Sequence, residues 1–177
     1  MPDLHVYGAG QKDAKVKLAA GTTFDIEAII EVSGDPQQET VEVKGDDTLK
    51  TTFVFSQTEN VTIRANAISF DVLQAITGNT YGSSAVGSEI PLGTVSEQNP
   101  PFIELQSFVL AKRADNVATT IEKIFHKVQI YTIKINSSNG NEFSVEMTGK
   151  AYQTATDIAG AALTPARIAT IKEATNI

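Results

Sequence analysis

Residues 69–79 read SFDVLQAITGN, and this stretch carries the start and stop signals of a short α-helix. Ser69 is a suitable N-cap, because its hydroxyl can accept a hydrogen bond from a first-turn amide that has no helical partner. Asp71 lies in the first turn, where a negative charge suits the helix dipole, and Gly78 can adopt the left-handed conformation that ends a helix. One face of the helix should be apolar, because its hydrophobic residues recur at helical spacing: Ile68, Val72, Leu73 and Ile76.

The segments on both sides of this helix mostly alternate apolar and polar residues with the period of two that is typical of strands. Asn139-Gly140 is the strongest hairpin signal, since both residues tolerate the positive φ of a tight turn. The expected strands cover residues 24–32, 38–44, 48–56, 59–65, 101–112, 121–135 and 141–152. This pattern predicts a mainly β fold, an antiparallel β-sandwich or small barrel with one short internal α-helix, extended loops and terminal arms. The helix is expected to plug an open end or to flank the sheet.

We expect residues 1–177 to form a single domain. Its expected parts are a core at about 20–152, an N-terminal arm or strand at 1–19 and a C-terminal arm at 153–177. Within the C-terminal arm, Thr164-Pro165 predicts the start of a helix, because Thr is a good N-cap and Pro is favoured at the first helical position. Residues 78–100 are rich in glycine and irregular, and a connection of this length is usually functional or disordered.

The acidic residues are unevenly distributed. The chain of 177 residues has a formal net charge of −7, and residues 25–47 alone also sum to −7, because eight acids there face only Lys44. A surface built in this way repels nucleic acid. It could also serve simply as a solubilising outer face.

Residue types that carry catalysis are scarce. The chain has no cysteine, which excludes disulfides, zinc–thiolate sites and thiol nucleophiles. His126 lies in an expected strand on the same face as Ile124, Val128 and Ile130, where a partnered structural histidine is more common than a general base. Neither a phosphate-binding glycine loop nor an EF-hand spacing occurs. We therefore expect no enzymatic activity, no cofactor and no metal.

No targeting or membrane segment is evident. The N-terminus lacks the pattern of a signal peptide, and no stretch approaches the roughly 18 apolar residues of a membrane span. The chain is expected to be made in a cytoplasm and to remain soluble.

Residues 38–79 resemble the core of the tailed-bacteriophage tail tube proteins, also called major tail proteins. In that family a pair of strands precedes a further strand and a short helix, which ends in a glycine before a variable loop. The likeness covers roughly residues 20–152 and includes the hairpin at Asn139-Gly140. It implies that the following helix residues pack on the sheet or end the helix: Phe70, Val72, Leu73, Ile76 and Gly78.

The resemblance implies a structural subunit of stacked hexameric rings, whose β-barrel lumen conducts DNA during genome ejection without binding it specifically. Such a protein is made in the host cytoplasm and resides in the virion tail. Its partners would be further copies of itself and other tail proteins, namely the tail tip or baseplate, the terminator and the tape measure. The lumen candidates are Asp25, Glu27 and Glu31. The candidates for contacts between rings, in the hairpin-like segment 33–52, are Asp35, Glu39, Glu42, Asp46 and Asp47.

Several alternatives stay open at the level of sequence. The acids could face outward, and the tube could belong to a non-contractile tail, a contractile tail or a secretion device of the same fold family. The alternative function is a soluble β-sandwich binding module for carbohydrate or for a virion-protein partner. The chain has no Trp and only four Tyr from which to build a sugar platform.

Overall fold

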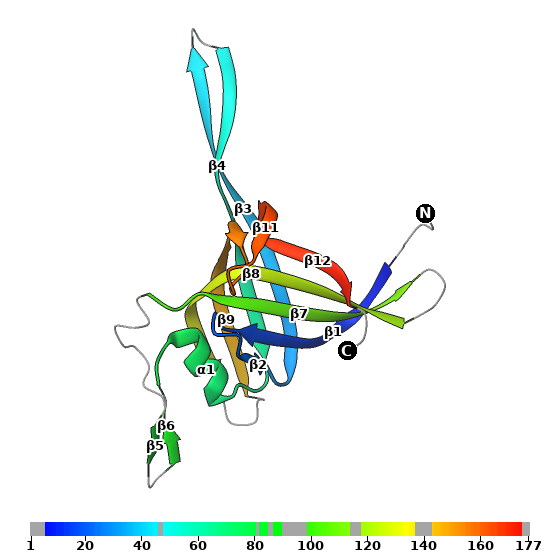
Figure 1. Ribbon diagram of the computed structural model, residues 1–177, viewed down its shortest axis with the longest axis vertical. Helices are drawn as coiled ribbons and strands as arrows, with labels where there is room; N and C mark the ends of the chain where they lie inside the picture. The colour runs from blue at the N-terminus through cyan, green and yellow to red at the C-terminus, as the bar shows by residue number, and fades with distance from the viewer. Residues whose placement is uncertain are drawn as a thin grey trace.

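The computed structural model (Figure 1) describes residues 6–45, 48–80, 82–84, 87–89, 99–113, 118–136 and 143–174. Its helix is α1 (Phe70–Thr77). Its strands are β1 (Val6–Lys17), β2 (Thr23–Asp25), β3 (Ile29–Gly45), β4 (Thr48–Ala65), β5 (Gly82–Ser84), β6 (Gly87–Glu89), β7 (Ile103–Arg113), β8 (Ala118–Asn136), β9 (Ser144–Tyr152), β10 (Thr154–Thr156), β11 (Ala162–Arg167) and β12 (Ala169–Ala174).

One antiparallel sheet of eight strands dominates the molecule. Its strand order is β2-β1-β7-β8-β9-β4-β3, and β12 also pairs with β8. Two small ribbons, β5–β6 and β10–β11, stand apart from it. The sheet curves around a core, and within the described residues no ladder joins β2 to β3, so the barrel is not closed. The expectation of a mainly β, sandwich-like fold with one short helix is confirmed.

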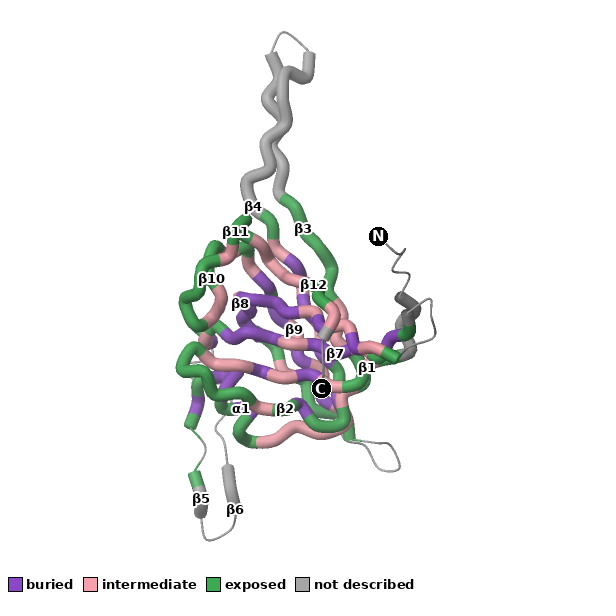
Figure 2. The backbone as a smooth tube through the Cα atoms, turned by 45° about the vertical axis from the view of Figure 1, so that its right-hand side comes forward, coloured by how far each residue is buried: buried purple, intermediate pink, exposed green. Residues whose placement is uncertain are grey.

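The core lies inside the curve of the sheet, under α1. Buried apolar side chains from β1, β4, β7, β8 and β9 meet those of the helix there. Figure 2 marks the buried positions along the strands of the sheet. The strands contribute every second residue to this core, so their alternate residues form an opposite face. The largest fully buried side chains include Phe125, Ile63, Ile103, Leu105 and Met147.

Helix α1 has the ends that the sequence predicts. The Ser69 hydroxyl accepts a hydrogen bond from the amide of Val72 at 3.3 Å, and Gly78 has a φ of +74°. Val72, Leu73 and Ile76 are buried, but Phe70 is 40% exposed. The implied packing of Phe70 stays a prediction, because its side chain at the start of the helix is more exposed than those of the other apolar helix residues.

The expected strand 24–32 is wrong, because the chain turns in its middle. β2 ends at Asp25, and Ala28 adopts a positive φ of 49°. The amide of Ile26 donates to the Ala14 carbonyl at 2.8 Å, which holds this turn against β1. β3 then begins at Ile29 in a new phase, so that Ile26 is buried and Ile30 is 52% exposed.

The expected C-terminal helix is also wrong. Thr164 and Pro165 lie within β11, whose described ladder partner is β10 alone. An edge strand tolerates proline, since no partner needs the missing amide proton. β12 adds to the edge of β8, where Ala169 pairs with Phe125 and Ala174 with Thr120. At the other end of the chain, β1 is a full member of the sheet.

The hairpin between β8 and β9 is present, with Asn136 opposite Ser144. Its expected turn, Asn139-Gly140, lies outside the described residues. The two expected strands 48–56 and 59–65 form one continuous strand, β4.

Candidate assembly surfaces

The β3–β4 ribbon is the first candidate surface. The β3–β4 ladder runs from Ile29 opposite Ala65 to Gly45 opposite Thr48, whereas β9 supports β4 only from Thr58 onward. The ribbon therefore projects from the body at the end away from α1 (Figure 1). At about 3.3 Å per residue, the eight residues of β3 after Gln37 reach roughly 26 Å beyond that support.

A two-stranded ribbon without a third strand is at best marginally stable in water. Within the described residues, the outer part of this one finds no further strand of its own chain. Its stability would rise if another molecule packed against it. Of the acids expected to make contacts here, Asp35 lies in β3 near the body and accepts a hydrogen bond from Gln37 at 2.8 Å. Glu39 and Glu42 lie further along β3, in the ribbon. Asp46 and Asp47 lie outside the described residues.

The second surface is the face of the sheet opposite the core, where a row of charged side chains crosses four strands. Arg64 of β4 contacts Glu31 of β3 at 3.6 Å and Glu146 of β9 at 3.0 Å. Lys134 of β8 contacts the same Glu146 at 3.2 Å. The hydrogen bonds from Lys134 and Arg64 lower the pKa of the Glu146 carboxyl. We call Glu31, Arg64, Glu146 and Lys134 the charge row; its positive and negative groups balance.

The three lumen candidates do not share one strand face. Asp25 ends β2 and pairs with Lys15 at 3.2 Å, Glu27 lies in the turn between β2 and β3, and Glu31 belongs to the charge row. Alternation in the expected strand 24–32 would have placed all three on one face, but the turn at Ala28 separates these acids. Basic side chains partner two of them.

An aromatic group lies beside the start of β7. The rings of Phe102 and Tyr152 meet edge to face at 5.9 Å, and the Lys127 ammonium lies 4.2 Å from the centre of the Phe102 ring. The Tyr131 and Tyr152 hydroxyls are in direct contact. Burial and this hydrogen bond raise the pKa of Tyr131 to about 12, so its hydroxyl is neutral at physiological pH. A cavity of about 420 Å³ adjoins Phe102 and Lys127 and extends to His126 and Asp157.

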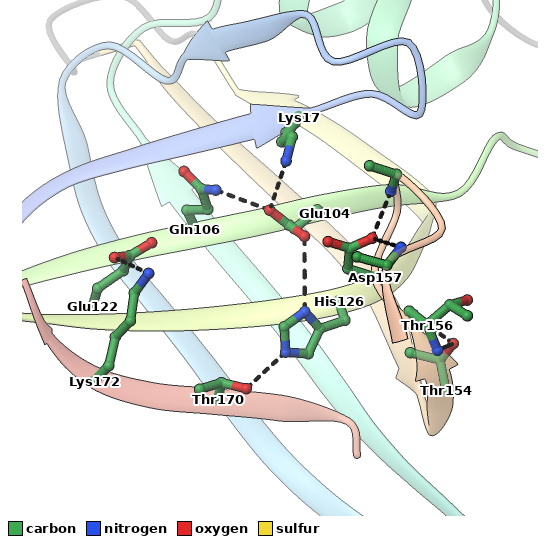
Figure 3. A network of polar contacts seen from close by, with 12 residues as sticks. Lys17, Glu104, Gln106, Glu122, His126, Thr154, Thr156, Asp157, Thr170 and Lys172 are labelled. Carbon is green, nitrogen blue, oxygen red and sulfur yellow. Dashed lines mark hydrogen bonds and ion pairs between the residues drawn. The ribbon is translucent and has the colours of Figure 1, made fainter. Parts of the chain in front are cut away.

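His126 lies on the other side of the strand from the expected one. A bulge where β7 pairs with β8 places both Phe125 and Val128 in the core. His126 therefore points away from the core, toward Glu104 of β7 and Thr170 of β12 (Figure 3). The expected shared face with Val128 is wrong, because one extra residue in a strand reverses the alternation.

Two other features bear on function. Within the described ranges, no three His, Cys, Asp or Glu side chains gather as metal ligands would. The helix that the structure describes is too short and too polar to cross a bilayer, and no other helix in that part of the chain could do so.

Comparison with known proteins gives likenesses of fold alone. No protein-family model matches the chain, and no curated protein matches it. A solved structure titled as the virion of a native gene transfer agent particle contains a similar chain, with a TM-score of 0.46 and 12% identity over 80% of this chain and 92% of that chain. The tail of an empty gene transfer agent particle, with C6 symmetry, gives a TM-score of 0.47 and 13% identity over 80% and 91%. A type six secretion system protein gives 0.39 and 15% over 85% and 89%.

Proposed function

We propose that this chain is the repeating structural subunit of a phage-type tail tube, in which hexameric rings stack and DNA passes through the lumen. The observation that carries the proposal is the projecting β3–β4 ribbon, which lacks a third strand from its own chain in the described structure. A feature of that kind is stabilised by packing on a neighbouring copy. Six copies per ring follow from the sequence resemblance of residues 38–79.

The curved sheet supplies the two faces that such a subunit needs. Its inner face is covered by α1 and the core, which makes the subunit a rigid body. We place the opposite face, with the charge row, toward the lumen. Because the charges in the row balance, the row itself offers no net positive charge to phosphates, which favours the passage of DNA without its being held.

The remaining parts of the proposal follow from this role. The chain acts in the virion tail after synthesis in the host cytoplasm, and it does not act as an enzyme. It contacts further copies of itself and other tail proteins. Glu39 and Glu42 belong to the projecting ribbon, which is the part that would reach the next ring, and Asp46 and Asp47, outside the described residues, stay candidates for the same contact.

Electron microscopy of the concentrated, purified protein tests the proposal. We expect hollow tubes or six-fold rings. A variant in which residues 40–55 are replaced by an Asn-Gly turn should keep the circular dichroism and cooperative melting of the body, because every core residue that the structure describes remains, but should form no rings. Monomers of the full chain at millimolar concentration, also when mixed with preformed tail ends, would favour the soluble binding module instead. Rings formed by the shortened variant would show that the ribbon does not carry assembly.

A further inference from the structure

Strand β12 covers part of one edge of β8. β9 occupies that edge from Val128 to Asn136, and β12 continues along it, pairing with Thr120 to Phe125. Both are antiparallel to β8. Because β12 is the last described element, its removal would leave the rest of the sheet order intact and expose the backbone groups of this part of β8.

Polar contacts hold β12 in place more than apolar burial does. Ile171 at its centre is 68% exposed. Lys172 pairs with Glu122 at 3.1 Å, and the Thr119 hydroxyl donates to Glu173 at 2.5 Å. Ile168 and Ala169 at its start pack partly on the core. The strand beyond Ala169 therefore has few buried apolar contacts, which is the property of segments that open locally at low free-energy cost.

The third polar contact of β12 involves a buried titratable ring. His126 is 6% exposed, and its Nε2 lies 2.7 Å from the Thr170 hydroxyl (Figure 3). Its Nδ1 has no hydrogen-bond partner in the described part of the chain and lies 3.8 Å from a Glu104 oxygen. A hydroxyl can donate to a neutral imidazole nitrogen, so the contact with Thr170 does not require a charged ring.

Charged groups face His126 from every element packed around it. They are Glu104 of β7, Arg167 at the end of β11, Asp157 after β10 and, behind Glu104, Lys17 of β1, which lies 3.8 Å from the Glu104 carboxylate. Burial has the largest effect and lowers the pKa of His126 from 6.5; Glu104 and Asp157 oppose this change, and Arg167 adds to it. Because Lys17 and Gln106 already contact Glu104, that carboxylate only partly offsets the cost of a buried charge.

We propose that β12 is a releasable strap, which detaches from the edge of β8 when His126 takes up a proton. Detachment removes Thr170 from the ring and lets water reach it, so the released state binds the proton more readily than the attached state. Attachment is therefore complete above pH 6.5 and weakens as the pH falls below that value. Release would leave the backbone groups of Thr120 to Phe125 on this edge of β8 unpaired.

Hydrogen exchange of the full chain, measured amide by amide between pH 8 and 5.5 and corrected for the intrinsic pH dependence, tests the strap. We expect the protection of the Thr170–Ala174 amides to fall by up to about tenfold between pH 7.5 and 5.5, the limit set by one proton with an ordinary pKa of 6.5 in the released state. The amides of Val61–Ala65 should keep their protection, because β4 does not pair with β8 or β12 and β9 lies between β4 and β8 in the sheet order. Equal protection of β12 at both pH values would overturn the proposal.

Two variants isolate the ring. His126→Gln cannot take up a proton but can still bond Thr170, so its β12 should stay protected at every pH. Glu104→Gln removes a group that favours the charged ring in the attached state, so its strap should lose more protection at pH 5.5 than that of the natural chain, with the same onset near pH 6.5. If His126→Gln lost protection throughout the sheet, the test would rest on Glu104→Gln alone. An unchanged pH dependence of β12 protection in Glu104→Gln would then count against the strap. A natural pH profile in a well-folded His126→Gln would also refute it.

Discussion

At the residue scale, Gly34 makes room for a buried carboxylate. A Cβ at this position of β3 would overlap the carboxyl group of Glu59 on β4. That carboxylate contacts the Lys123 ammonium at 2.7 Å, with only 10% of the Glu59 side chain exposed. Gly34→Ala should therefore push Glu59 away from Lys123 and lower the free energy of unfolding by about 1–3 kcal/mol, measured by urea denaturation.

Gly82→Ala is the matched control for this substitution. A Cβ at Gly82 would meet nothing within 4 Å, and its φ lies outside the left-handed region. The control should change the free energy of unfolding by less than about 0.5 kcal/mol. If Gly34→Ala were equally harmless, Glu59 would have another satisfactory position, and the fit between Gly34 and the ion pair would have no energetic importance.

The contacts of the charge row could not be predicted from the sequence, for a physical reason. Arg64 and Glu146 are 82 residues apart and meet only through the register of β4 and β9. Sequence alternation places each on a polar face, but it does not state which residue lies opposite which. His126 was placed on the wrong face for a related reason, since a bulge leaves no clear mark in the residue pattern.

At the scale of elements, the sequence correctly predicted the features that depend only on neighbouring residues. The cap at Ser69 and the stop at Gly78 were predicted, because capping depends on a few neighbouring residues. The break after Asp25 and the strand at Ala169–Ala174 were missed. Both depend on distant partners: β1 holds the turn at Ile26, and β8 supplies the ladder that makes β12 a strand instead of a helix.

The packing of α1 gives a prediction at this scale. Leu73 is buried, whereas Phe70, one turn earlier, is 40% exposed. Leu73→Ala should lower the free energy of unfolding by about 2–5 kcal/mol, because it leaves a cavity between helix and sheet. Phe70→Ala should cost less than about 1 kcal/mol. Thermal and urea unfolding followed by circular dichroism would measure both, and equal costs would mean that the Phe70 ring is packed as closely as the Leu73 side chain.

At the scale of the whole molecule, the fold class and the assembly hypothesis could be reached from the sequence, but the orientation of the subunit could not. The hypothesis rested on the order of elements in residues 38–79. The choice of face depends on how the sheet curves, which puts α1 and the core on one side and the charge row on the other. Glu31 belongs to the charge row, whereas Asp25 and Glu27 lie at or next to the β2–β3 turn, and this difference is evident only in the three-dimensional structure.

That separation allows the face of the lumen to be determined by charge reversal. Glu31→Lys with Glu146→Lys makes the charge row positive, whereas Asp25→Lys with Glu27→Lys changes the net charge equally at the β2–β3 turn. Tubes assembled from each variant with short duplex DNA would be treated with nuclease, and the protected DNA would be counted at several salt concentrations. We expect the first pair to protect DNA in a salt-dependent way, because counterion release then favours binding inside the tube. The second pair and the natural chain should protect none. Protection by the second pair alone would place the turn, and not the charge row, in the lumen wall.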